Sequence, residues 1–213
     1  AARAAIRKGD PDSARTEAME IRRSLLGPAI NATGVLLHTN LGRAPIEYSQ
    51  FGRASNLEFN LATGGRGSRN SHAADLISRL TGAESALIVN NCSAAVILVL
   101  AALARDRAVT VSRGELVEIG GGFRVPDVMA ESGTRLVEVG TTNRTRLADY
   151  EAAGRFHDIA LSLKVHPSNY KIKGFTEETS VRELSQLGPP VVVDIGSGFV
   201  DEACQWLKDG RPV

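Results

Sequence analysis

The stretch VVVDIGSG (residues 191–198) runs from three valines into an aspartate and a glycine-rich turn. A short run of β-branched residues bounded by glycines is typical of a strand that is buried on both faces of a parallel sheet. Asp194 ends this strand, where an ionised carboxylate is costly to bury unless a cation pairs with it. A pyridinium nitrogen, a metal ion or an arginine would serve, and capping of the following turn is the structural alternative.

Apolar runs and helical patterns alternate along the chain from residue 71 onward. The expected strands cover residues 86–89, 108–112, 136–139, 159–165 and 191–195. The expected helices cover residues 71–80, 93–105, 126–132, 147–153 and 180–187. This alternation predicts an α/β fold with a mostly parallel sheet and helices on both faces, in which ligands bind at the carboxyl ends of the strands.

The N-terminal part of the chain has a different pattern. Residues 1–26 predict one or two amphipathic helices, which are broken by GDPD at residues 9–12 and end at a Gly-Pro pair. We therefore expect a helical linker or domain remnant over residues 1–28 and a second domain over residues 29–213.

Composition excludes several classes of protein. The 25 Lys+Arg and 24 Asp+Glu give a net charge of +1, which excludes a histone-like polycation and an acidic disordered tail. Cys92 and Cys204 form no CxxC pair and the four histidines show no HxxxH spacing, so we expect no disulfide framework, no metal site and a cytoplasmic location. No run approaches ~18 apolar residues, so no membrane span is expected.

A second strand end stands where the run 86–89 passes into a helix through Asn91, Cys92 and Ser93. The amides of a helix N-terminus suit a phosphate, although a simple N-cap would use the same residues. A phosphate site of this kind, combined with Asp194 on a later strand, is the layout of a pyridoxal phosphate enzyme of the aminotransferase-like fold (fold type I). The aspartate keeps the pyridine nitrogen protonated, which makes the ring an electron sink.

Two further strand ends carry weaker candidates. Glu115 precedes a run of three glycines, a pattern that is more often a turn than a ligand site. His166 alone is typical of a structural histidine, but with Ser168 and Asn169 close behind it the segment becomes a candidate site.

Several segments of the sequence resemble those of one known family, bacterial selenocysteine synthase, the L-seryl-tRNA(Sec) selenium transferase. The resemblance runs in order from about residue 29 to residue 200, which is most of the chain. It is carried by NATGVLLHTNLGRAP (31–45), SNLEFN (55–60), TGGRGSR (63–69), LTGAESALIVNN (80–91), SRGELVEIGGGFRVPDVM (112–129), VEVGTTNRT (137–145), KVHPSNYKIKGFTEE (164–178) and VVVDIGSG (191–198).

The resemblance implies a reaction and its partners. Pyridoxal phosphate would support loss of water from seryl-tRNA(Sec) to give an aminoacrylyl-tRNA, to which selenium from selenophosphate adds to form selenocysteinyl-tRNA(Sec). It also implies a cytoplasmic homo-oligomer in the form of a large ring.

The resemblance implies roles for particular residues as well. Asp194 would pair with the pyridine nitrogen, while Asn91, Cys92 and Ser93 would surround the phosphate. The remaining candidates are Ser168 and Asn169 near the ring oxygen or the substrate carboxyl side, His166 beside them, Glu115 at the face of the ring, and Arg66 and Arg69 as forks for selenophosphate or an RNA phosphate.

The family's Schiff-base lysine lies in a GDK-type segment downstream of the aspartate strand, and no such segment occurs in this chain. None of the five lysines has that context: Lys8, Lys164, Lys171, Lys173 and Lys208. We therefore expect an internal fragment, truncated at its C-terminus within the cofactor domain and inactive alone.

Two alternatives remain open from the sequence. A related pyridoxal phosphate lyase that acts on amino sugar acids would share the fold without the tRNA. A non-catalytic nucleotide-binding α/β module would use the glycine-rich turns, but GxGxxG does not follow the first strand as that module requires.

Overall fold

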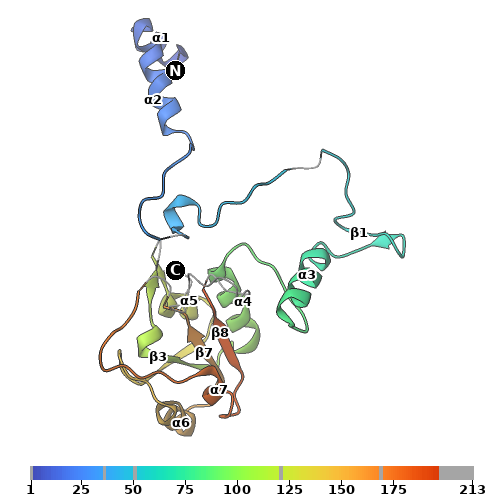
Figure 1. Ribbon diagram of the computed structural model, residues 1–213, viewed down its shortest axis with the longest axis vertical. Coiled ribbons are helices and arrows are strands. Elements are labelled where there is room, and N and C mark those ends of the chain that lie inside the picture. The colour runs from blue at the N-terminus through green and yellow to red at the C-terminus, as the bar shows by residue number, and fades with distance from the viewer. Residues whose placement is uncertain (1, 36, 50–51, 120–121, 168–169, 197–213) are drawn as a thin grey trace. The chain divides into compact units, whose positions relative to one another are not determined.

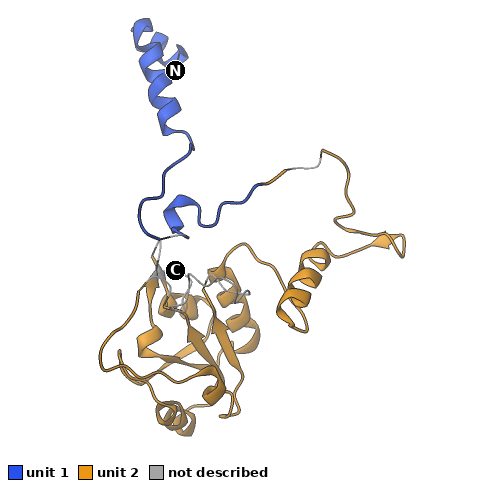
Figure 2. Cartoon of the chain, viewed as in Figure 1, with its two compact units in different colours: residues 1–47 blue, residues 48–213 orange. Residues whose placement is uncertain are grey.

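The computed structural model describes residues 2–35, 37–49, 52–119, 122–167 and 170–196 (Figure 1). The chain divides into two compact units, residues 1–47 and residues 48–213, which are described separately (Figure 2). The domain boundary after residue 28 stays a prediction.

The first unit is built on two short helices, α1 (Ala2–Arg7) and α2 (Ala14–Ser24), joined by the 3-10 turn η1 (Pro11–Ser13). The turn forms because the Asp10 side chain accepts a hydrogen bond from the Ser13 amide and so caps η1, as is typical of aspartate before a helical turn. A second 3-10 turn, η2 (Thr39–Leu41), follows in the same unit. The helices broken at GDPD are therefore present as expected.

The second unit contains a four-stranded parallel sheet. Its strands are β3 (Ala108–Ser112), β6 (Arg135–Val139), β7 (Ile159–Val165) and β8 (Val191–Asp194). They lie in the order β6-β3-β7-β8, with every neighbouring pair parallel. The expected parallel α/β sheet is confirmed, and all four carboxyl ends lie at one edge.

Two hydrophobic clusters lie on the two faces of the sheet. Val109 and Val111 of β3 belong to the core cluster that includes Val96 and Leu100 of α4 (Cys92–Leu103). The same cluster contains residues of α5 (Val125–Glu131). Because alternate side chains of a strand point to opposite faces, α4 and α5 cover one face of the sheet.

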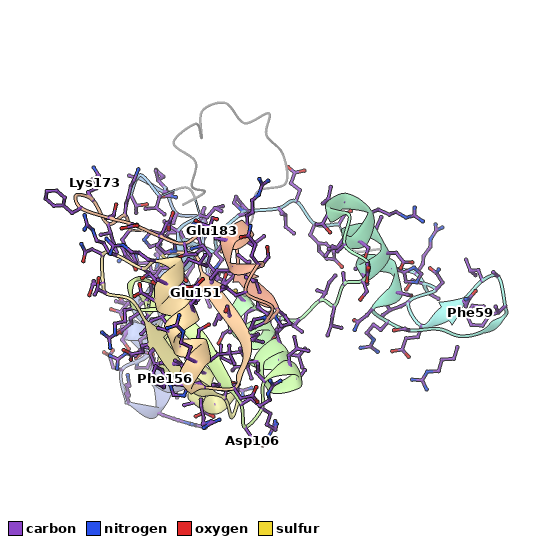
Figure 3. The ribbon with its side chains drawn as sticks, turned by 90° about the horizontal axis from the view of Figure 1, so that it is seen from below. Phe59, Asp106, Glu151, Phe156, Lys173 and Glu183 are labelled. Carbon is purple, nitrogen blue, oxygen red and sulfur yellow. The ribbon has the colours of Figure 1, made fainter. Side chains whose placement is uncertain are left out.

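The other face packs against α6 (Leu147–Phe156) and α7 (Val181–Leu184), where Tyr150 and Leu184 belong to the same hydrophobic cluster as Val139. α7 begins at a capping box, in which Ser180 Oγ accepts from the Glu183 amide and the Glu183 carboxylate accepts from the Ser180 amide. At the start of α6 the Asp149 carboxylate accepts from the Arg146 amide. Glu151 and Phe156 lie on the exposed side of α6 (Figure 3). The expectation of helices on both faces therefore holds.

The remaining elements of the second unit are short, apart from the amphipathic helix α3 (Ser71–Thr81). One antiparallel pair, β1 (Phe59–Asn60) with β2 (Gly65–Arg66), precedes α3, and a second, β4 (Glu118–Ile119) with β5 (Phe123–Arg124), precedes α5. The 3-10 turn η3 (Arg113–Glu115) follows β3 directly. In the described part of the chain, no helix has the length and apolar content to cross a membrane.

One predicted strand is wrong. Residues 86–89 are assigned to no strand, and Leu87 and Ile88 are exposed. An apolar run becomes a strand only where a neighbour supplies its backbone partners, and the described residues provide none beside this run. In addition, β8 ends at Asp194 rather than at Ile195.

The centre of β7 should determine the stability of this unit. Leu161 is fully buried among the residues that α4 and α5 cover. We expect Leu161→Ala to lower the free energy of unfolding by about 3 kcal/mol, because it removes buried methyl groups and leaves a cavity. Urea unfolding measures this loss, and Leu103→Ala on the exposed side of α4 should change it by only about 0.5 kcal/mol. Equal losses in the two variants would contradict this packing.

The buried Tyr150 phenol should make stability depend on alkaline pH. Burial, and secondarily the Glu115 charge, raises the pKa of Tyr150 above its ordinary value. The neutral phenol is thus favoured by folding, so its contribution is complete below pH ~10 and is lost as the pH rises further, by up to about 1.4 kcal/mol per pH unit. Urea unfolding from pH 9 to 11.5 should show a shallower decline for Tyr150→Phe, and an unchanged decline for Tyr48→Phe, whose side chain is exposed. Identical slopes for wild type and Tyr150→Phe would refute this assignment.

Candidate functional site

A cavity of about 490 Å³ opens at the carboxyl edge of the sheet. Its walls come from η3, residues 142–145, residues 164–167, residues 176–178 and residues 193–195. Ligand sites of parallel α/β sheets lie at this edge, so the cavity occupies the position that the sequence predicted.

Asp194 lies half-buried at the end of β8 and lines the cavity. Its Oδ1 accepts hydrogen bonds from the Gly196 amide at 2.9 Å and from Cys92 Sγ at 3.4 Å. The structure therefore shows the capping alternative, in which the carboxylate caps its own turn through Oδ1, and the pairing with a cation stays a prediction. Within the described residues, Oδ2 makes no hydrogen bond and can accept one from a ligand.

His166 is fixed beside Asp194 by the backbone. Its amide donates to the Asp194 carbonyl oxygen at 3.0 Å, which extends the pairing of β7 with β8 by one residue. The ring lies against the turn at Gly196, which has φ +63° and no Cβ; a Cβ there would lie 3.0 Å from His166 Nδ1. Glycine at this position therefore allows both the turn and the close approach of the histidine.

The N-terminus of α4 contacts Asp194 but does not line the cavity. The Asn91 side chain accepts from the Ala94 amide at 2.8 Å, so Asn91 is the N-cap of α4. A simple N-cap was the alternative to a phosphate-binding role for this segment. The Ser93 amide lies in the first helical turn, where a backbone N–H has no intrahelical partner, and it can donate to an anion. The structure thus brings Cys92 and Asp194, two of the residues predicted to bind the cofactor, into contact, and their roles stay predictions.

Glu115 lines the cavity and forms an ion pair with Lys164. Its Oε1 accepts from Lys164 Nζ at 2.9 Å and its Oε2 accepts from the Val165 amide at 2.9 Å. The sheet register places Lys164 and Asp194 on opposite faces, because Val165 and not Lys164 pairs with Asp194. The sequence signal for this ion pair was a lysine within a largely apolar, buried strand.

Arg66 and Arg69 both bind Glu58 in the β1–β2 region. Arg66 Nη2 lies 3.3 Å from one carboxylate oxygen of Glu58, and Arg69 Nη2 lies 2.6 Å from the other. Neither arginine is among the residues that line the cavity. The two guanidinium groups therefore converge on one carboxylate, which has the charge of the anions that the sequence analysis assigned to them.

Ser168 and Asn169 lie outside the described residues, so their predicted roles stay predictions. Just after them, the Tyr170 hydroxyl donates to the Gly114 carbonyl oxygen at 3.2 Å. Among the described residues, no three His, Cys, Asp or Glu side chains form a group that could hold a metal ion.

The loop at residues 142–145 is a wall of the cavity that was not predicted from the sequence. Thr145 Oγ1 lies 2.7 Å from Ser112 Oγ, a buried hydrogen bond that ties this loop to the end of β3. Gly114 allows the approach, because a Cβ there would lie 2.8 Å from the Thr142 carbonyl oxygen. In the sequence this loop was noted only as part of the motif VEVGTTNRT (residues 137–145), which contributes to the family resemblance. Its residue types suggested no catalytic or binding role.

Comparisons with known proteins agree on one family. The family described as "SelA: L-seryl-tRNA selenium transferase" matches residues 29–212. An L-seryl-tRNA(Sec) selenium transferase of Moorella thermoacetica is 56% identical over 204 residues, which cover 91% of this chain and 43% of that protein. One of Solidesulfovibrio magneticus is 58% identical over 194 residues, which cover 86% and 41%. The chain thus spans a little under half the length of these curated relatives.

A solved structure is similar in fold. The structure of D-glucosaminate-6-phosphate ammonia-lyase matches with a TM-score of 0.54 and 23% sequence identity, covering 67% of this chain and 42% of that one. At this identity the likeness concerns the fold alone.

The contact between Gly196 and His166 gives a test of the site's architecture. We expect Gly196→Ala to lower the free energy of unfolding by about 1–2 kcal/mol, because alanine is strained at φ +63° and its Cβ meets the histidine ring. Gly154→Ala in α6, where a Cβ meets nothing within 4 Å, should instead raise it by up to about 1 kcal/mol. Urea unfolding compares the two, and a neutral Gly196→Ala would show that the ring does not pack there.

Proposed function

The chain belongs to the L-seryl-tRNA selenium transferase family, and on that premise we propose that it supplies part of the site that converts L-seryl-tRNA(Sec) to L-selenocysteinyl-tRNA(Sec). Selenophosphate is the proposed selenium donor. The proposal concerns the whole protein, because the chain matches only 43% of the first relative's length.

The donor set at the sheet edge fits pyridoxal phosphate, on which this family depends. When bound, this group supplies an electron sink for the carbanion at the substrate's α-carbon. The supporting observation is the 3.4 Å contact between Cys92 Sγ and Asp194 Oδ1, because it joins a helix N-terminus to a strand-end carboxylate. Those are the two features that a phosphate and a protonated pyridine nitrogen require.

Each of these residues has a proposed task. Asp194 would hold the proton of the pyridine nitrogen through its open Oδ2. The first-turn amides of α4 and the side chains of Cys92 and Ser93 would bind the phosphate, with Asn91 keeping the turn in place. His166, fixed by its amide, would line the substrate side together with Ser168 and Asn169.

Arg66 and Arg69 are the proposed binding groups for selenophosphate or an RNA phosphate. Their shared partner Glu58 occupies both guanidinium groups, and an incoming anion would take over these charge-assisted hydrogen bonds. An assembly of several copies into a ring, and a cytoplasmic location, complete the proposal.

Asp194→Asn in the full-length protein tests the central residue of this proposal. An amide cannot hold the pyridine proton as a carboxylate does, so we expect roughly 100-fold slower selenocysteinyl-tRNA formation, about 2.7 kcal/mol of transition-state stabilisation. The exposed ion-pair residue Asp158 provides the control variant Asp158→Asn, which should leave the rate unchanged.

Two results would count against the proposal. A rate within threefold of wild type for Asp194→Asn would remove the assigned role of the carboxylate. Binding of seryl-tRNA(Sec) no tighter than a non-cognate tRNA would favour the alternative of a lyase that acts on amino sugar acids.

A further inference from the structure

The strands β3 and β7 pair unequally at their carboxyl ends. Their last paired residues are Val111 and Leu163, so the register places Arg113 opposite Val165. The chain has left β3 at that point, however, and residues 113–115 form η3. The Val165 amide on this side of β7 therefore has no strand residue to donate to.

The Glu115 side chain fills this gap. Its Oε2 accepts from the Val165 amide at 2.9 Å and thus takes the place of the missing backbone carbonyl. An amide in this buried position would otherwise lack a partner, which is costly. Glu115 thereby extends the hydrogen bonding of β7 to its last residue, directly before His166.

Lys164 balances the charge that this arrangement buries. The side chains of Lys164 and Glu115 are only 18% and 12% exposed, and their charged atoms lie 2.9 Å apart. Lys164 Nζ also lies 3.9 Å from Glu178 in a third wall of the cavity. The ion pair therefore connects η3, β7 and residues 176–178.

The hydrogen bond between Glu115 and the Val165 amide also affects the position of Asp194, because Val165 lies between the two residues. Val165 pairs with Asp194 across the sheet, and the next amide, that of His166, donates to the Asp194 carbonyl oxygen. A shift of the end of β7 would move both His166 and Asp194.

We propose that Glu115 is a positioning residue, which holds the end of β7 through the Val165 amide and so sets His166 and Asp194 for ligand binding. Lys164 is its charge partner and has no part in covalent chemistry. This assignment deepens the proposed function and rests on it for the ligand, pyridoxal phosphate. It replaces the expectation that Glu115 lies at the face of the cofactor ring.

Amide hydrogen exchange in the full-length protein tests the contact itself. In Glu115→Ala, the Val165 and His166 amides should exchange roughly tenfold faster than in wild type, because one has lost its acceptor and the other its fixed neighbour. The Val109 amide in the core of β3 should stay protected. Glu118→Ala, which removes the carboxylate of an exposed ion pair with Arg124, is the matched control and should leave all three amides unchanged.

Conservative variants separate positioning from a general loss of structure. Glu115→Gln retains one acceptor oxygen but leaves Lys164 without its counter-charge, so it should show part of the effect. Adding Lys164→Met removes the unpaired ammonium, and the double variant should recover most of the protection of Val165. These variants also keep the test decisive if Glu115→Ala does not fold.

Pyridoxal phosphate affinity, followed by the visible absorption of the bound cofactor, tests the link to the site. We expect the dissociation constant to rise about tenfold in Glu115→Gln and to return toward wild type in the double variant. Unchanged exchange at Val165 and His166 in Glu115→Ala would overturn the contact, and altered exchange with unchanged affinity would overturn its positioning role. A wild-type protein that binds no pyridoxal phosphate would instead refute the proposed function, while the exchange results would still judge the contact.

Discussion

The parallel pairing of β7 with β8, which places Val165 opposite Asp194, is the constraint on which the candidate site depends. It carries the Asp194 carboxylate to the sheet edge on the face that α4 covers, where Cys92 reaches it. The same pairing carries Lys164 to the other face, where it meets Glu115. The register of β7 and β8 therefore places Asp194 on one face of the sheet and the ion pair of Lys164 with Glu115 on the other.

The strand ends are held by side chains where the backbone ladder stops. Glu115 accepts from the Val165 amide, Ser112 contacts Thr145, and Asp194 accepts from the Gly196 amide. Buried backbone groups need partners, and at this edge polar side chains supply them. A polar residue in such a place can serve the fold and a ligand at once, as we propose for Asp194, whose Oδ1 accepts from the Gly196 amide while Oδ2 is assigned to the ligand.

The sequence predicted the parallel α/β sheet, helices on both faces and the position of Asp194, because β-branched runs, helical periodicity and strand-end polarity are local signals. It failed for residues 86–89, since a strand also requires a neighbour that no local pattern reveals. The ion pair between Glu115 and Lys164 was not predicted, because it joins residues that lie 49 positions apart in the chain. The loop at residues 142–145 was missed for the same reason: its contacts are with Ser112 and Gly114, far from it in the chain.

A crystal structure of the full-length protein with pyridoxal phosphate bound tests the central claim most directly. We expect an Asp194 carboxylate oxygen about 2.8 Å from the pyridine nitrogen and the phosphate at the first turn of α4. A cofactor bound elsewhere, or one whose pyridine nitrogen has no contact with Asp194, would contradict it.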